Sequence, residues 1–110
     1  MSLTLYGLKN CDTCKKALKA LEGAGKRVTF VDIRADADLV SLVPTWLEQA
    51  GDARLVNRRS TTWRTLSEGE RSTDPLALLT AHPTLIKRPV IETDGKVFVG
   101  WSKDEQSALL

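Results

Sequence analysis

A strand, a tight turn, a helix and a second strand are predicted within the first 33 residues, and this order restricts the fold more than any other part of the sequence. Residues 1–6 alternate between apolar and polar side chains, as in a half-buried strand. Residues 7–10 form the turn, and helical spacing of apolar side chains then runs to the glycines that end segment 11–25. The β-branched run 28–33 predicts a parallel second strand, because a strand, helix and strand of this length form a crossover unit.

The middle of the chain is predicted to be helical. Apolar residues recur at helical spacing over 39–50, but a proline is expected only in a first turn. Because Pro44 falls inside this pattern, the regular helix is predicted to begin nearer Ser41. A short helix is expected over 62–67, and another over 75–81, where an aspartate cap precedes a proline.

The last third returns to strands. Residues 89–93 and 96–100 are predicted to form a hairpin, because Asp94-Gly95 between them is a strong turn signal. Ser102 then caps a terminal helix. The order β-α-β, a helical insertion and β-β-α is that of a thioredoxin-like α/β fold with a mixed four-stranded sheet, expected as a single domain over residues 1–110.

Composition excludes several classes of protein. A chain of 110 residues with 42% apolar and 27% charged residues is typical of one soluble domain. The net charge of +2 does not favour nucleic-acid or membrane partners, and two cysteines are too few for a secreted disulfide scaffold. No leader pattern and no apolar run near the ~20 residues of a membrane span is seen, so we expect a cytoplasmic protein.

Cys11 is the first candidate for chemistry. At a helix N-terminus, backbone N–H groups and the helix dipole stabilise a thiolate, which is the reactive form of cysteine. Lys9 adds positive potential nearby, whereas Asp12 opposes it. The alternative is an inert buried thiol, against which the polar turn argues.

Cys14 has two interpretations that the sequence leaves open. It follows Cys11 by one helical turn, so the pair has a separation that suits a disulfide, and Cys14 is a candidate resolving thiol. It also begins the apolar stripe of the helix, where a small buried residue satisfies the packing. A metal site is not predicted, because His82 is the only other strong ligand and structural zinc needs four.

Two further segments carry candidate binding groups. Pro89 opens a strand, which is consistent with a cis peptide bond, and Arg88 before it offers a forked cation for a carboxylate or oxyanion. Segment 58–64 (Arg-Arg-Ser-Thr-Thr-Trp-Arg) holds three arginines. They predict either a solvated face or an anion pocket beside Cys11.

Four ordered motifs together resemble the ArsC/Spx family. They are Tyr6-Gly7-Leu8-Lys9-Asn10-Cys11-Asp12-Thr13 with Lys16-Ala17, Asn57-Arg58-Arg59-Ser60-Thr61-Thr62-Trp63-Arg64, Ile86-Lys87-Arg88-Pro89 and Val99-Gly100-Trp101-Ser102. The Thr-Thr-Trp-Arg stretch is most similar to the YffB-like branch of glutathione-dependent thiol reductases. The resemblance implies a thioredoxin-like fold with a helical insertion, Cys11 as nucleophile and Pro89 as its cis proline.

The same resemblance implies the site and its partners. Catalysis would use Cys11, Arg88 and, as resolving thiol, Cys14, while glutathione would be a co-substrate rather than a bound cofactor. The residues expected to bind glutathione or the substrate are Lys9, Asn10, Thr13, Arg59 and Pro89, with Arg59 and Arg88 holding anionic ends and Thr13 as a donor to the sulfur. The substrate would be a small-molecule or protein thiol or disulfide.

Two alternatives follow from the same family. Glutathione/glutaredoxin-coupled arsenate reductases surround their cysteine with three arginines, of which one corresponds to Arg88 here. The others fall near Asn57 and Gly100, so most of that oxyanion clamp is missing. The Spx branch shares the Cys-x-x-Cys and an arginine like Arg59 and acts as a transcriptional regulator bound to the RNA polymerase α subunit. This sequence lacks the longer C-terminal segment of that branch, so we rank Spx-like regulation second, after thiol reduction.

Overall fold

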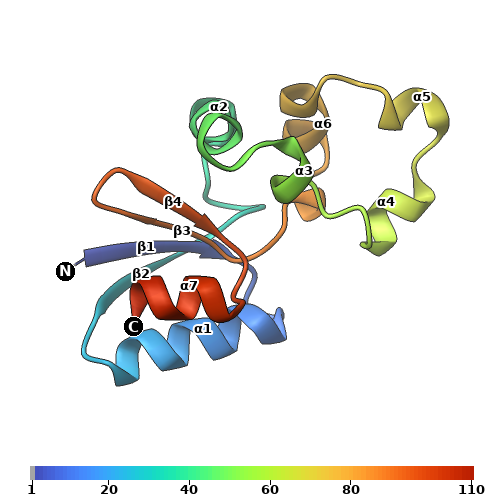
Figure 1. The fold of residues 1–110 in the computed structure, drawn as a ribbon. Helices are drawn as coiled ribbons and strands as arrows, with labels where there is room; N and C mark the ends of the chain where they lie inside the picture. Colours follow the sequence, from blue (N-terminus) through green and yellow to red (C-terminus); the bar gives the residue numbers. More distant parts are fainter. Residues whose placement is uncertain (1) are drawn as a thin grey trace. The chain divides into compact units, whose positions relative to one another are not determined.

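The computed structural model describes residues 2–110, in which four strands form one mixed sheet (Figure 1). The strands are β1 (Ser2–Gly7), β2 (Arg27–Asp32), β3 (Val90–Thr93) and β4 (Lys96–Val99), in the spatial order β2-β1-β3-β4. β1 is parallel to β2 and antiparallel to β3, and β3 is antiparallel to β4. Asp94 and Gly95, both at positive φ, form the predicted hairpin turn.

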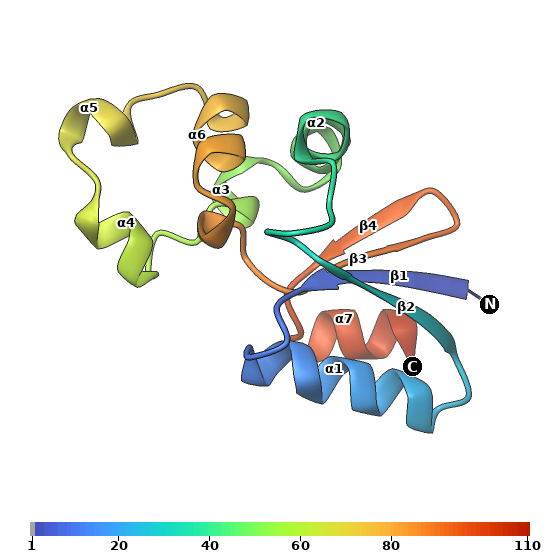
Figure 2. The same ribbon diagram turned by 180° about the vertical axis from the view of Figure 1, so that it is seen from behind.

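Helices α1 (Asp12–Gly23) and α7 (Lys103–Leu109) lie side by side on one face of this sheet (Figures 1 and 2). The register places Leu5 opposite both Phe30 and Ile91, so apolar side chains of three strands point toward these helices. The core between sheet and helices consists of Leu3, Leu5, Cys14, Ala17, Leu21, Ile91 and Leu109. This arrangement confirms the predicted thioredoxin-like α/β fold.

The chain divides into two compact units. The first contains the described residues up to Ala37 together with Arg88–Leu110, and the second is Asp38–Lys87. The first unit is therefore assembled from two separate chain segments and holds the whole sheet. The expectation of a single domain stays a prediction.

The second unit is helical, as the sequence predicts. It contains α2 (Leu39–Ala50), α3 (Asp52–Leu55), α4 (Thr61–Thr65), α5 (Glu68–Arg71), α6 (Pro75–Ala81) and the 3-10 turn Pro83–Leu85. An isolated β-bridge joins Val56 to Ile86, and the backbone N–H of Lys87 donates to the carbonyl of Leu55 at 2.8 Å. The single-turn helices α3 and α5 and this bridge are not foreseen by the sequence pattern.

The predicted start of α2 near Ser41 is wrong. The helix begins at Leu39, and the backbone N–H groups of Ser41 and Leu42 bond the carbonyl of Asp38, so a full turn forms ahead of Pro44. Pro44 removes only the bond to the carbonyl of Val40. Val40 is 70% exposed, so water can satisfy that carbonyl and the proline is tolerated inside the helix.

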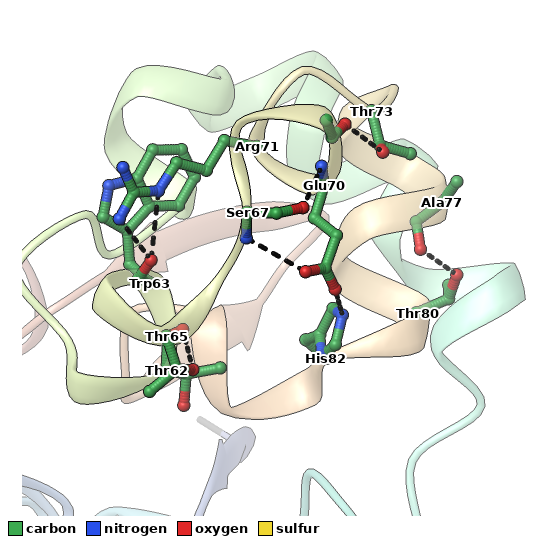
Figure 3. A network of polar contacts seen from close by, with 11 residues as sticks. Thr62, Trp63, Thr65, Ser67, Glu70, Arg71, Thr73, Ala77, Thr80 and His82 are labelled. Carbon is green, nitrogen blue, oxygen red and sulfur yellow. Dashed lines mark hydrogen bonds and ion pairs between the residues drawn. The ribbon is translucent and has the colours of Figure 1, made fainter.

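Short helices of the second unit are fixed by side-chain caps (Figure 3). Ser67 and Glu70 form a capping box at α5, and Glu70 also lies 3.7 Å from Nε2 of His82, which ends α6. The guanidinium of Arg71 donates through Nε and Nη2 to the carbonyl of Trp63 at 3.2 and 3.0 Å. In residues 2–110, no helix combines the length and the apolar character that crossing a bilayer requires.

Candidate thiol site

Cys11 is the N-cap residue of α1. Its extended backbone (φ −92°, ψ 117°) turns the chain into the helix, and its Sγ accepts a hydrogen bond from the backbone N–H of Cys14 at 3.4 Å. The Cys11 N–H in turn bonds the carbonyl of Leu8 at 3.1 Å, which closes the turn before the helix. The sulfur therefore lies at the open N–H groups of the helix start, as predicted, and it is half-buried there.

The pKa of Cys11 lies below its ordinary value. Burial raises the pKa, but hydrogen bonds from the Cys14 thiol and from the Cys14 backbone N–H oppose burial and outweigh it together with Arg88. Arg88 acts through a side-chain hydrogen bond to the sulfur and through its charge. Each of these groups stabilises the thiolate over the thiol, so the site favours the reactive form.

Cys14 is the buried partner of this pair. It is 1% exposed, belongs to the core beneath the sheet, and carries a free thiol, as does Cys11. Burial, followed by the hydrogen bond and charge of Cys11, raises the pKa of Cys14. The thiol of Cys14 therefore stays protonated and donates to Cys11, and it also fills the core position that the apolar stripe predicted.

Arg88 and Pro89 adjoin the cysteines in the same unit. The Arg88–Pro89 peptide bond is cis, as the resemblance implies. The carbonyl of Pro89 accepts from the backbone N–H of Gly100 at 2.8 Å, and Gly100 adopts φ +90°, a conformation that favours glycine. Trp101, the next residue, packs on the same hydrophobic core as Cys11.

Two pockets flank the turn before Cys11. One, of about 310 Å³, is almost wholly apolar and is lined by Leu8, Lys9, Cys14, Lys15, Leu18 and Phe30. The other, of about 410 Å³, is polar and is lined by Leu8, Lys9, Asn10, Asp32, Arg34 and Ala35. Lys9 and Asn10 were expected from the sequence, whereas Asp32 and Arg34 were not. The sequence held a signal for both: Asp32 lies at the end of a strand predicted to be parallel to β1 and Arg34 follows that strand, whose end lies beside the Cys11 turn.

The remaining predicted site residues are placed as follows. Thr13 is exposed in the first turn of α1. Arg59 belongs to the second unit, where its backbone N–H donates to Oδ1 of Asn57 at 3.2 Å, and its role beside Cys11 stays a prediction.

All three arginines of segment 58–64 are exposed, as on a solvated face, and the Trp63 ring among them has two arginine neighbours. The guanidinium carbons of Arg58 and Arg71 lie 5.3 and 5.2 Å from the centroid of the Trp63 ring, as cation–π contacts do. Arg58 also lies 3.6 Å from Asp52. Among residues 2–110, no three His, Cys, Asp or Glu side chains are grouped as a metal site would need.

Similarity to known proteins extends over nearly the whole chain. An uncharacterised protein of Haemophilus influenzae is 43% identical over 110 residues, 96% of each chain. Among solved structures, YffB is 34% identical with a TM-score of 0.86 and covers 98% of both chains. A Brucella melitensis protein described as arsenate reductase (ArsC) related is 41% identical with a TM-score of 0.73, covering 98% of this chain and 93% of its own.

A more distant relative is the global transcriptional regulator Spx of Bacillus subtilis, 26% identical over 110 residues that cover 94% of this chain and 82% of Spx. Residues 6–109 match the ArsC family. This match spans almost every element of the fold, from the end of β1 to α7. The chain belongs to the ArsC family.

Proposed function

We propose that the protein is a thiol oxidoreductase in which Cys11 forms a mixed disulfide that glutathione resolves. The observation that carries this proposal is the position of the Cys11 sulfur, half-buried at the start of α1 with the backbone N–H of Cys14 donating to it. The Cys14 thiol and Arg88 add to this hydrogen bond in lowering the pKa of Cys11. The attacking species in disulfide exchange is a thiolate, so a lowered pKa increases the reactive fraction at neutral pH.

The proposed reaction consists of two exchanges. The Cys11 thiolate attacks the glutathione sulfur of a mixed disulfide RS–SG, a Cys11–SG bond forms, and the released RS⁻ takes a proton from water. The thiolate of a second glutathione then attacks the Cys11–SG bond, which yields oxidised glutathione and restores the Cys11 thiolate. The substrate is reduced and two glutathione units are joined, so electrons balance without any further reductant.

Cys14 supports this reaction as a hydrogen-bond donor. A resolving thiol must ionise and reach the mixed disulfide, whereas Cys14 is buried and its pKa is raised. We therefore favour glutathione over Cys14 as the resolving group. Arg88 would hold an anionic end of glutathione or stabilise the departing sulfur, and Arg59 would contribute a second cation.

The test is glutathione-dependent reduction of the mixed disulfide between glutathione and 2-mercaptoethanol. We expect Cys11→Ser to abolish turnover. We expect Cys14→Ala to retain turnover at a rate several-fold lower, because the Cys11 thiolate loses the hydrogen bond from the Cys14 thiol and a smaller fraction of Cys11 is ionised. Equal rates for the wild type and Cys11→Ser would refute the proposal.

Mass spectrometry of the oxidised protein separates the two roles of Cys14. We expect a glutathione adduct on Cys11 with Cys14 still alkylatable after denaturation. An internal Cys11–Cys14 bridge as the main product would instead make Cys14 the resolving thiol.

The likeness to Spx favours testing a second candidate, binding to RNA polymerase, which the family resemblance implies for that branch. A pull-down with the C-terminal domain of the polymerase α subunit tests it directly. Absence of binding removes this candidate.

A further inference from the structure

The polar pocket lies where β1 and β2 both end. These strands are parallel, with Gly7 paired to Asp32, and the backbone N–H of Ile33 donates to the carbonyl of Gly7 at 2.9 Å. The pocket of about 410 Å³ thus lies outside the carboxyl ends of two adjacent parallel strands, the usual ligand position in α/β proteins. Asn10 in its wall directly precedes Cys11 in the chain, so the pocket shares the turn that leads into Cys11.

The charges around the pocket are of both signs. Lys9 and Arg34 supply two exposed cations, and Asp32 supplies one carboxylate. Oδ1 of Asp32 accepts the backbone N–H groups of Arg34 and Ala35 at 2.8 and 2.9 Å, which fixes the carboxylate at the pocket wall. These hydrogen bonds, then the charges of Arg34 and Lys9, lower the pKa of Asp32, so the carboxylate is ionised at neutral pH.

We propose that this pocket binds the zwitterionic amino-acid end of the γ-glutamyl group of glutathione. Arg34 and Lys9 hold its α-carboxylate, and Asp32 receives its α-ammonium. This assignment rests on the proposed function and names the part of the co-substrate that the pocket recognises. A bare carboxylate, such as the other end of glutathione, fits less well because Asp32 would repel it.

The geometry also accounts for how the thiol is presented. Lys9 and Asn10 belong to the turn that the Cys11 N–H closes through the carbonyl of Leu8, so one wall of the pocket and the Cys11 sulfur belong to the same hydrogen-bonded turn. A ligand anchored by its amino-acid end would hold its own sulfur toward Cys11. Binding at this pocket would therefore lower the KM for glutathione and leave the exchange step unaltered.

A binding experiment tests the pocket without turnover. The Cys11→Ser protein is titrated with S-methylglutathione, which cannot form a disulfide, and backbone amide shifts are followed by NMR. We expect the largest shifts at Lys9, Asn10, Arg34 and Ala35, and affinity about three- to tenfold lower in Arg34→Ala. Arg27→Ala is the matched control, since this exposed arginine begins the same strand at its opposite end.

A second ligand measures the contribution of Asp32 to binding separately. The glutaryl analogue of S-methylglutathione keeps the carboxylate and lacks only the α-amino group. We expect the Cys11→Ser protein to prefer S-methylglutathione over this analogue about three- to tenfold, and Asp32→Asn to lose the preference. Asparagine keeps an Oδ1 acceptor for the two backbone N–H groups, so the turn is preserved.

Kinetics separate this inference from the proposed function. If the wild type turns over, Arg34→Ala should raise the KM for glutathione with kcat unchanged, and should leave 2-mercaptoethanol as reducing thiol unaffected. Turnover without any change in Arg34→Ala or Asp32→Asn would overturn the pocket assignment alone. Absence of wild-type turnover would overturn the proposed function. In the binding experiment, amide shifts confined to other surfaces would overturn the assignment of the ligand to this pocket.

Discussion

A Cβ atom at Gly7 would lie 2.5 Å from Sγ of Cys14 and 3.2 Å from its Cβ, closer than ordinary van der Waals contact permits. The last residue of β1 therefore has no side chain because the thiol that supports Cys11 occupies that space. The strand end and the helix start are thus packed backbone against sulfur. The close packing of Gly7 against Cys14 therefore fixes the position of the thiol that lowers the pKa of Cys11.

Gly7→Ala should weaken both fold and site. Overpacking at a buried position typically costs about 1–3 kcal/mol, and we expect a loss of that order in the free energy of unfolding measured with urea. Displacement of Cys14 should also raise the pKa of Cys11. In Gly7→Ala/Cys14→Ala the 2.5 Å contact is gone, so the stability penalty of the alanine should be smaller than in the wild-type background.

Gly23→Ala provides the control for this substitution. Apart from its chain neighbours and the backbone of its own helix, no heavy atom lies within 4 Å of a Cβ at Gly23, which ends α1. Its effect should remain within about 0.5 kcal/mol. A loss at Gly23 equal to that at Gly7 would show that the steric contact with Cys14 is not the cause.

The pH dependence of Cys11 alkylation should reflect its hydrogen bonds. We expect half-maximal reaction with iodoacetamide below the free-thiol pKa of about 8.5, with the label located at Cys11 by mass spectrometry. Cys14→Ala and Arg88→Met should each move the midpoint to higher pH, because each removes a group that stabilises the thiolate. Lys16→Met, at an exposed position on the same helix, should leave it in place. A wild-type midpoint at or above the free-thiol value would contradict the electrostatic account.

Tyr6 offers a clean titration because it is the only tyrosine in the sequence. Its hydroxyl donates to Oε1 of Glu92 at 3.0 Å, and burial together with this partner raises the pKa of Tyr6 to about 12. The ultraviolet absorbance of tyrosinate should therefore appear near pH 12 in the folded protein and near pH 10 in urea.

The same shift has a consequence for stability. A folded pKa above the unfolded one means that the contribution of Tyr6 is full below about pH 10 and is lost as the pH rises toward 12. In Tyr6→Phe this part of the pH dependence should disappear. An unchanged decline in the variant would assign it to other groups.

Arg71→Lys should destabilise the second unit although the charge is kept. The guanidinium both stacks on Trp63 and donates twice to its carbonyl, and lysine reproduces neither the planar stack nor the fork (Figure 3). We expect a loss of about 1 kcal/mol in thermal or urea unfolding. Arg64→Lys, at an exposed neighbour on α4, should have almost no effect.

Much of the fold follows from patterns that are local in the sequence. The hairpin of β3 and β4 is encoded by Asp94-Gly95, α6 by its Asp74 cap and following proline, and α7 by the Ser102 capping box. Each signal acts within a few residues, so no knowledge of distant contacts is needed to use it. The Cys11 turn and its helix belong to the same class.

The features that escaped prediction depend on side-chain exposure, on helices too short to show a period, or on contacts between distant residues. The start of α2 was misplaced because the cost of Pro44 depends on the exposure of Val40, which the sequence does not state. Single-turn helices such as α5 have too few residues to show a period, although the Ser67 and Glu70 box marks its start. Asp32 and Arg34 join the site only through the parallel register of β1 and β2.

The two-segment construction of the first unit has a consequence for synthesis on the ribosome. β1 pairs with β3 through Thr4 and Glu92, so the sheet cannot be completed until most of the chain has been made. The helical unit Asp38–Lys87 is contiguous and leaves the ribosome earlier, so it can fold first. Cys11 precedes this helical unit in the chain and Arg88 follows it, so Cys11 acquires Arg88 only after the helical unit has been synthesised. During that interval the thiol lacks the hydrogen bond and the charge of Arg88, and the pKa of Cys11 falls further when the second segment of the first unit joins the sheet.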